Sequence, residues 1–318
     1  MTRLVVVTDQ AFGGVEREAA IAAGFGARFA EHHCRTEKET IAAVAGASVA
    51  FVNFAPITES VLERLKPEAL VIRYGIGVDN VDLDAARRLG VSVANVPDYG
   101  SDTVADHAAA SLLALLRRIP HYDRAIRADG WTLPTDVGPV VGFGSTTVGL
   151  VGTGRIGLAL AGRLVPFGIR VIAHDPYADA DLTAAAGVEL VGLDELLTSS
   201  HGISLHAPLT DETRRLINAD TLARMRPGAV LVNTARGGLV DSLALAGSLE
   251  RGHLAGAALD VMEPEPLPLD SPLRTAPGVV LTPHAAFYSD DSLAALQRLA
   301  AEEAGRYLAG QPLRCRVV

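Results

Sequence analysis

Short apolar runs alternate with longer amphipathic runs along the chain, and this pattern predicts strands alternating with helices. In the first hundred residues we expect strands at residues 4–8, 27–29, 49–53, 69–73 and 91–95. Helices are expected between them, at residues 15–23, 38–45, 59–66 and 83–89. Short apolar strands that alternate with helices are typical of a parallel sheet covered on both faces.

A long helical pattern at residues 101–118 separates this part from the next. Ser101 or Asp102 can cap its start, whereas Arg117 and Arg118 suit a helix C-terminus and Pro120 follows shortly after. We interpret this helix as the first crossing between two domains. Residues 129–147 are rich in glycine and proline, and we expect a surface loop there.

A second series of strands and helices follows. Strands are expected at residues 147–151, 169–174, 188–190, 202–205, 229–233, 255–260 and 279–282, with helices at 155–167, 193–199, 219–225 and 243–251. A last helix at 290–309 can return the chain to the first domain. The predicted fold class is therefore α/β, with two doubly wound parallel-sheet domains. One domain, of residues 101–286, is inserted into a discontinuous domain of residues 1–100 and 287–318.

Composition narrows the class of protein. A chain of 318 residues with 49% apolar residues can form two medium domains, and its net charge of −9 argues against nucleic acid as a partner. Cys34 and Cys315 fit neither a disulfide framework nor a metal site, and they suit a reducing compartment. From the first strand at the start of the sequence we expect no signal peptide, and the absence of a long apolar run predicts no membrane-spanning segment. We expect a cytoplasmic protein without a bound metal or a membrane partner.

The glycine-rich turn within residues 148–157 carries the first candidate chemistry. Gly152, Gly154 and Gly157 fit G-x-G-x-x-G between a predicted strand and a predicted helix. The first glycine allows a tight turn, the second lets a pyrophosphate approach the backbone, and the third lets the helix pack closely. The free N–H groups of the helix N-terminus then face the phosphates. Because the chain holds 31 glycines, the motif could match by chance, and its position between a predicted strand and a predicted helix is the stronger evidence.

The next predicted strand ends in Asp175, which indicates the kind of dinucleotide. A carboxylate at this place can bind both hydroxyls of an adenosine ribose, and it would repel a 2′-phosphate. The sequence therefore predicts NAD, in preference to NADP, as the cofactor.

Three later segments offer reactive side chains at the carboxyl ends of strands. Arg236 follows a buried strand and two glycines follow it, so its guanidinium can hold a carboxylate; a surface salt bridge is the alternative. Asp260, Glu263 and Glu265 lie in a proline-stiffened turn that could equally be a solvated acidic loop. A lone histidine such as His284 is more often structural than catalytic, but a carboxylate partner would change that, and Glu265 is a candidate.

Together these segments resemble the D-isomer-specific 2-hydroxyacid dehydrogenase family over nearly the whole chain. The resemblance rests on the loop at 73–79, the glycine turn, residues 206–210, residues 233–241, and Glu265 with His284. It is nearest to the C-terminal binding protein and phosphoglycerate dehydrogenase-like branch, as residues 175–177 and 282–289 indicate. The resemblance implies an NAD-binding Rossmann domain inserted into a flavodoxin-like substrate-binding domain.

The resemblance also implies roles for individual residues. Arg236 would bind the substrate, His284 would donate and accept the proton, and Glu265 would tune His284. Arg73 and the backbone N–H groups of Ile76 and Gly77 would contact the substrate, although Arg73 could equally form a strand-end salt bridge. The residues implied for the cofactor, besides His284, are Thr103, Gly152, Gly154, Arg155, Ile156, Gly157, Asp175, His206, Pro208, Thr234, Ala235 and Asp260.

These roles imply an oxidoreductase that transfers a hydride between NAD and C2 of a D-2-hydroxy acid or 2-oxo acid. The alternative is an NADH-responsive dimerising protein of the C-terminal binding protein type with little catalysis. Phe287 replaces a tryptophan of those proteins, which puts their substrate preference in doubt here. Formate dehydrogenases of this superfamily pair their histidine with glutamine, so Glu265 argues against their chemistry. The family is usually dimeric through the cofactor domain, so we expect a homodimer to which the helix near 102–118 contributes.

Overall fold

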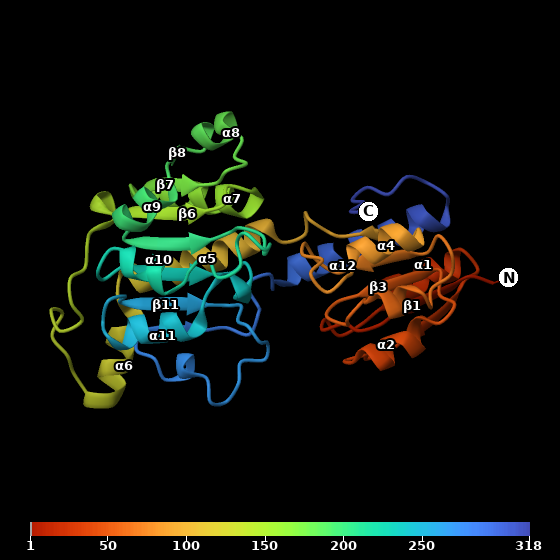
Figure 1. Cartoon of the computed structure of the whole chain (residues 1–318), viewed down its shortest axis with the longest axis horizontal. Helices are drawn as coiled ribbons and strands as arrows, with labels where there is room; N and C mark the ends of the chain where they lie inside the picture. Colours follow the sequence, from red (N-terminus) through yellow and green to blue (C-terminus); the bar gives the residue numbers. More distant parts are fainter. Residues whose placement is uncertain (1) are drawn as a thin grey trace. The chain divides into compact units, whose positions relative to one another are not determined.

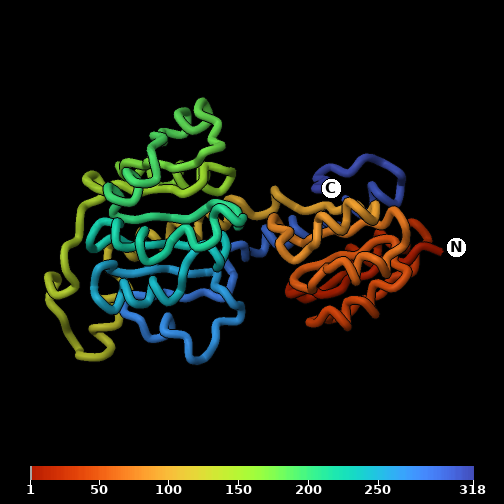
Figure 2. The backbone as a smooth tube through the Cα atoms, viewed as in Figure 1, coloured from red at the N-terminus to blue at the C-terminus, as the bar shows by residue number. Residues whose placement is uncertain are grey.

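The structure is a computed structural model that describes residues 2–318 and divides them into two units (Figures 1 and 2). One unit comprises the residues up to Gly100 together with Ser289–Val318, and the other comprises Ser101–Tyr288. The second unit is therefore an insertion into the first. The return to the first unit falls at Ser289, two residues after the expected start at residue 287.

The discontinuous unit contains one parallel sheet of five strands (Figure 1). Its strand order is β2-β1-β3-β4-β5, the order found in flavodoxin-like folds. The central strands are almost entirely buried and rich in valine, as expected for a sheet covered on both faces. The strands are β1 (Leu4–Val7), β2 (Arg28–Glu31), β3 (Val49–Val52), β4 (Leu70–Arg73) and β5 (Ser92–Ala94).

Helices flank this sheet, and several of them begin at side-chain caps. Thr36 forms a capping box with Glu39, and Asp82 accepts a hydrogen bond from the N–H of Ala85. The C-terminal helix packs against the first helix and the fourth strand, so distant parts of the sequence share one core. The helices are α1 (Glu16–Gly24), α2 (Glu37–Val44), α3 (Glu59–Leu62), α4 (Leu83–Leu89) and α12 (Asp290–Leu308).

The inserted unit contains a parallel sheet of seven strands in the order β12-β11-β10-β9-β6-β7-β8. The order reverses between β6 (Thr147–Val151) and β9 (Gly202–Leu205), which pair with each other although two strands separate them in sequence. Open α/β sheets bind ligands outside the carboxyl ends of the strands at such a point. The remaining strands are β7 (Arg170–His174), β8 (Val188–Leu190), β10 (Val230–Asn233), β11 (Gly256–Leu259) and β12 (Val279–Leu281).

Two apolar cores, one on each face, hold the inserted sheet between its helices. The long helix α5 packs on α7 and crosses β10, so its small alanine-rich face is buried within the unit. The helices are α5 (Ser101–Leu116), α6 (Ile119–Asp129), α7 (Arg155–Leu164), α8 (Ala180–Ala185), α9 (Leu193–Ser199), α10 (Ala219–Arg224) and α11 (Ser242–Glu250). None of the helices described in residues 2–318 has the length and apolar character to cross a membrane.

The structure departs from the predicted elements at a few places. Helix α6 was not predicted: Pro120 stands in its first turn, where a missing N–H costs nothing, instead of marking only the end of α5. Helix α8 was also missed, and Asp179 caps it. Helix α7 ends at Leu164 and continues as a 3-10 turn, Val165–Phe167, around Pro166.

Candidate active site

The glycine turn lies between β6 and α7, at the point where the strand order reverses. Gly152 has φ +100°, and a Cβ there would lie 2.8 Å from the carbonyl oxygen of His206. A Cβ on Gly157 would lie 2.3 Å from the carbonyl oxygen of Gly152. Both positions therefore require glycine. Gly154 faces open space on its Cβ side and directly precedes α7, which leaves room for a ligand at the N-terminus of this helix.

Asp175 follows β7 and supports the glycine turn. One carboxylate oxygen accepts hydrogen bonds of 2.8 Å from both the N–H and the hydroxyl of Thr153, and the other accepts one of 2.9 Å from the N–H of Tyr177. Burial opposes ionisation here, but these hydrogen bonds outweigh it and lower the pKa of Asp175. The carboxylate is therefore held in its charged form beside the turn. It has acceptor capacity left for ribose hydroxyls.

Other residues named for the cofactor line the same carboxyl edge of the sheet. His206 follows β9; burial lowers the pKa of its imidazole to about 4, so the ring is neutral at pH 7 and pairs with the Ser204 hydroxyl at 2.9 Å. The hydroxyl of Thr234, just after β10, is buried and has no partner within the part of the chain that the structure describes. An orphaned buried hydroxyl and an open glycine turn both fit a dinucleotide whose polar groups would complete them.

The remaining cofactor candidates are placed by neighbouring elements. Arg155 and Ile156 form the first turn of α7, and Thr103 lies in the first turn of α5. Pro208 follows β9, and Ala235 follows β10.

Arg236 is held by a turn that the sequence motif contained but did not explain. Asn233, which ends β10, is fully buried; its amide donates to the carbonyl of Arg236 at 2.8 Å and accepts from the N–H of Ala235 at 3.0 Å. Gly237 comes so close to the backbone of Met262 that a Cβ would lie 2.1 Å away. The turn is thus fixed on two sides, and the guanidinium of Arg236 donates a hydrogen bond to the carbonyl of Ala235 at 2.6 Å.

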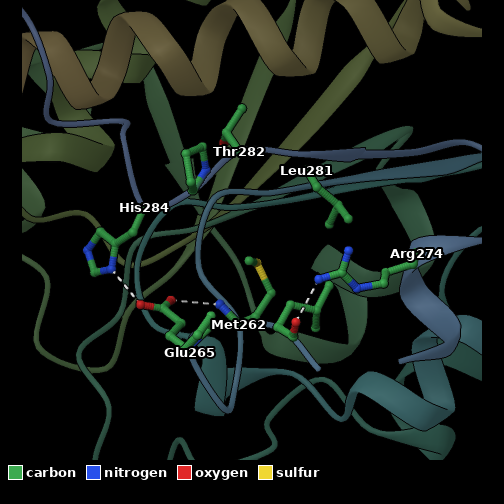
Figure 3. Close-up of a pocket in the computed structure, with 9 residues that line it drawn as sticks. Met262, Glu265, Arg274, Leu281, Thr282 and His284 are labelled. Carbon is green, nitrogen blue, oxygen red and sulfur yellow. Dashed lines mark hydrogen bonds and ion pairs between the residues drawn. The ribbon is translucent and has the colours of Figure 1, made fainter. Parts of the chain in front are cut away.

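His284 and Glu265 form a hydrogen-bonded pair (Figure 3). The distance from His284 Nδ1 to Glu265 Oε2 is 2.9 Å, and the other oxygen of Glu265 accepts from the N–H of Met262 at 2.9 Å. Burial raises the pKa of Glu265, but the hydrogen bonds to His284 and Met262 outweigh it, so the pKa is lowered. Glu265 therefore bonds Nδ1, and Nε2 is the ring nitrogen that does not bond this carboxylate. Glu263 pairs elsewhere, with Arg214 at 3.0 Å.

Asp260 braces the backbone that carries His284. Its buried carboxylate accepts from the Thr282 hydroxyl at 2.5 Å and from the N–H groups of Ala285 and Ala286 at 2.8 and 2.9 Å. His284 itself has φ +54°, a left-handed conformation that costs energy for a residue other than glycine. The sequence suggested Asp260 as an acidic turn residue and a cofactor contact, and it did not indicate this supporting role.

A pocket with a volume of about 360 Å³ lies next to the His284–Glu265 pair (Figure 3). Its walls are mostly apolar. Arg274 contributes a guanidinium, which is tied to the carbonyls of Leu267 and Pro268 at 2.8 and 2.7 Å. The lining residues are Met262, Glu265, Pro266, Leu267, Arg274, Leu281, Thr282, Pro283 and His284.

The candidate substrate residues Arg73, Ile76 and Gly77 lie in the other unit, at the end of β4 and in the loop after it. Arg73 folds back over Gly75, where a Cβ would lie within 3.0 Å of the guanidinium carbon. The carbonyl of Gly75 accepts from the N–H of Val96 at 2.9 Å, and the carbonyl of Ile76 accepts from the side chain of Asn95 at 2.7 Å. Sequence reasoning named the loop but missed Asn95, since nothing in the local pattern links these segments.

Comparisons with known proteins agree with this geometry. Residues 109–286 match the family described as D-isomer specific 2-hydroxyacid dehydrogenase, NAD binding domain. The chain is 44% identical to D-3-phosphoglycerate dehydrogenase of Mycobacterium tuberculosis over 245 residues, which are 77% of this chain and 46% of that protein. It is 41% identical to glyoxylate reductase of Korarchaeum cryptofilum over 249 residues, 78% of this chain and 75% of that one.

Solved structures match over the whole chain. The TT0316 protein of Thermus thermophilus has a TM-score of 0.87 and 35% identity, covering 99% of this chain and all of that one. An NAD-dependent formate dehydrogenase of Staphylococcus aureus in complex with NAD has a TM-score of 0.84 and 30% identity, covering 100% of this chain and 99% of that one.

The chain spans about half the length of the phosphoglycerate dehydrogenases that it matches. It matches the glyoxylate reductase and the solved structures over a much larger share of their length. The matched segment of 109–286 contains the glycine turn, Asp175, Arg236, Glu265 and His284, so NAD is the cofactor of this domain. The chain belongs to the D-isomer-specific 2-hydroxyacid dehydrogenase family.

Proposed function

We propose that this protein is an NAD-dependent D-2-hydroxyacid dehydrogenase that interconverts a 2-oxo acid and a D-2-hydroxy acid. The observation that carries the proposal is the hydrogen bond between His284 and Glu265 after β12, in the unit that contains the glycine turn. A carboxylate that orients an imidazole is the usual arrangement of a general acid and base. The family and the relatives named above support this reaction class.

In this proposal each side chain of the site has a separate role. NADH, when bound, supplies the hydride to C2 of the substrate. Arg236 holds the substrate carboxylate and polarises the carbonyl oxygen, because its guanidinium presents parallel donors. Protonated His284, oriented by Glu265, donates its proton from Nε2 to the oxygen that becomes the hydroxyl. Arg73 and the N–H groups of Ile76 and Gly77 are proposed to add further contacts to the substrate carboxylate.

Replacing His284 by alanine tests the mechanism. We expect the variant to lose nearly all NADH oxidation while NADH still binds, as a fluorescence titration would show. His33→Ala, an exposed histidine of the other unit, serves as the matched control and should keep normal turnover. Near-normal turnover by His284→Ala would remove this histidine from the mechanism.

The substrate class is best resolved by a spectrophotometric screen of NADH oxidation. The panel should contain glyoxylate, hydroxypyruvate, pyruvate, phenylpyruvate and branched 2-oxo acids, with formate and 3-phosphoglycerate in the reverse direction. We expect reduction of a 2-oxo acid and no oxidation of formate, since Glu265 stands where formate dehydrogenases carry glutamine. If NADH promotes dimerisation but no acid reacts, the alternative of an NADH-responsive binding protein gains support.

We also propose that the protein is a homodimer that associates through its inserted unit. No residue of α6 is buried in this structure, although the helix is amphipathic. Ile119 is 57% exposed, and beyond the helix Trp131 and Leu133 are 77% and 59% exposed. Exposed large apolar side chains on one helix and just beyond it are typical of an interface. The apolar face of α5, in contrast, is already covered within the unit, so we assign the larger share of the interface to α6.

Light scattering after size-exclusion chromatography tests the dimer. The wild-type chain should elute with twice the mass of one chain, and Trp131→Glu should shift the mass toward one chain. A matched substitution at an exposed aromatic residue elsewhere in the same unit, Tyr177→Glu, should leave the mass unchanged. A monomeric wild type would contradict this part of the proposal.

A further inference from the structure

Two peptide groups of the loop after β4 are held by hydrogen bonds to their carbonyl oxygens. The backbone N–H of Val96 donates to the carbonyl of Gly75 at 2.9 Å. The side-chain amide of Asn95 donates to the carbonyl of Ile76 at 2.7 Å. Both donors belong to the segment that follows β5, so the loop is fastened to one neighbouring segment at two successive carbonyls.

These two contacts determine where the N–H groups of the loop point. In a trans peptide the N–H lies opposite the carbonyl. Because the carbonyls of Gly75 and Ile76 face Asn95 and Val96, the N–H groups of Ile76 and Gly77 both point away from them. Within residues 2–318 neither N–H group has a hydrogen-bond partner. Two successive, unpaired N–H groups can donate hydrogen bonds to one anion.

Glycine makes this arrangement dependent on its fastening. Gly75 has φ +125°, a conformation that only glycine adopts readily, and Gly77 follows one residue after the clamped carbonyl. Glycine has many accessible backbone conformations, so a loop built on it loses its shape unless other groups fix it. The Asn95 amide is the side chain that fixes the peptide group between Ile76 and Gly77.

Asn95 is itself held in place. Its backbone N–H donates to the carbonyl of Cys315 at 3.2 Å. The N–H of Cys315 in turn donates to the carboxylate of Glu303, a residue of α12 that is 2% exposed, at 2.9 Å. The donor that orients the loop is thus connected to the core of the unit through the C-terminal segment.

We propose that Asn95 is a positioning residue that pre-organises the Ile76 and Gly77 N–H groups for the substrate carboxylate. This inference rests on the function proposed above. Asn95 does not touch the substrate; it fixes the direction of two donors before the substrate arrives. If the donor groups already have the correct direction before the substrate binds, no binding free energy is lost to ordering them. Its removal should therefore weaken acid binding and leave NADH binding unchanged.

The test compares Asn95→Leu, Asn95→Ala and Asn95→Asp with the wild type. The leucine side chain has nearly the size of asparagine but carries neither a donor nor a charge. We expect the KM for the best 2-oxo acid to rise about tenfold in the Leu and Ala variants, the size expected for one lost hydrogen bond of about 1.4 kcal/mol. The KM for NADH and the melting temperature should stay close to the wild-type values.

The aspartate variant supplies a readout that a merely structural role would not give. An ionised carboxylate cannot donate to the carbonyl of Ile76, but a protonated one can. The KM of Asn95→Asp should therefore recover toward the wild-type value as the pH falls, while the KM of Asn95→Leu stays high at every pH. If charge alone mattered, the leucine variant would keep the wild-type KM, and the proposal would be overturned.

Binding of oxamate, an unreactive 2-oxo acid analogue, separates this inference from the proposed function. Calorimetry in the presence of NADH measures oxamate affinity without turnover. A tenfold weaker affinity in Asn95→Leu supports the inference even if no tested acid is reduced, whereas equal affinities in wild type and variant overturn it. Turnover by the wild type tests the proposed function by itself.

Discussion

The Asp260 carboxylate gives the most quantitative prediction. Asn at this position has the same shape, but its amide nitrogen cannot accept a hydrogen bond. The carboxylate accepts from the Thr282 hydroxyl and from the N–H groups of Ala285 and Ala286, one of which must face the amide nitrogen in Asp260→Asn. That N–H group is left unpaired in the interior, opposite another donor.

The size of the effect follows from these contacts. A hydrogen bond to a charged group contributes about 1.5–3 kcal/mol, and an unsatisfied buried N–H adds to the loss, so we expect Asp260→Asn to cost about 2–4 kcal/mol of unfolding free energy. For a domain of this size that corresponds to a melting temperature lower by about 5–12 °C. Turnover should fall at least tenfold, because the left-handed backbone of His284 loses its brace.

Differential scanning calorimetry without cofactor measures the stability, so that any effect on NADH binding does not enter. Asp241→Asn is the matched control: one oxygen of Asp241 accepts both N–H groups at the start of α11, and asparagine keeps that oxygen. The control should change the unfolding free energy by less than about 0.5 kcal/mol. If Asp260→Asn melts with the wild type and keeps its turnover, the bracing role assigned to Asp260 is refuted.

Three further predictions concern the cofactor turn and a buried carboxyl. Gly157→Ala should weaken NADH binding at least tenfold in a fluorescence titration, because its Cβ would lie 2.3 Å from the carbonyl oxygen of Gly152, whereas Gly162→Ala, with open space, should bind normally. Asp175→Ala should raise the kcat/KM for NADPH relative to that for NADH, since a 2′-phosphate would no longer meet a carboxylate. An unchanged ratio of the two values would contradict the role of Asp175 in selecting NAD. Burial raises the pKa of Glu18 in the folded state above 4.5. Protonation of Glu18 therefore stabilises the folded state, fully so below pH 4.5, and this stabilisation is lost as the pH rises through the folded-state pKa. In urea titrations from pH 4.5 to 8, the wild type should therefore lose stability relative to Glu18→Gln; parallel curves would contradict this assignment.

The strands were the part of the fold most readily predicted from the sequence. Residues 147–151 and 202–205 are strands in the structure with the predicted bounds, because short apolar runs buried on both faces leave few alternatives. Residues 188–190 also form a strand with the predicted bounds, although this strand lies at the sheet edge and two of its three residues are exposed. Helix α6 was missed because Pro120 was interpreted as following the end of the preceding helix, whereas it stands in the first turn of α6, a helix with no buried residue. The same exposure makes it a candidate for an interface.

The candidate site was predictable as a set of residues but not as a set of contacts. The glycine turn could be predicted from a short stretch of sequence, because its three glycines lie close together at a fixed spacing. The contact between Glu265 and His284, and the support of Arg236 by Asn233, depend on which strand ends meet at one edge of the sheet. Nothing in a local window carries that information, and Asn95 was overlooked for the same reason.

The two carboxylates around His284 have different tasks. Glu265 forms a hydrogen bond with the imidazole ring of His284. Asp260 instead accepts hydrogen bonds from the backbone N–H groups that follow His284. A histidine with φ +54° is less stable than a glycine would be there, so this conformation persists only because the surroundings enforce it. The backbone conformation directs the side chain, and the hydrogen bond to Glu265 then fixes which ring nitrogen faces this carboxylate. A histidine that only filled space would need neither restraint, and this combination is the strongest structural reason to regard His284 as the proton donor.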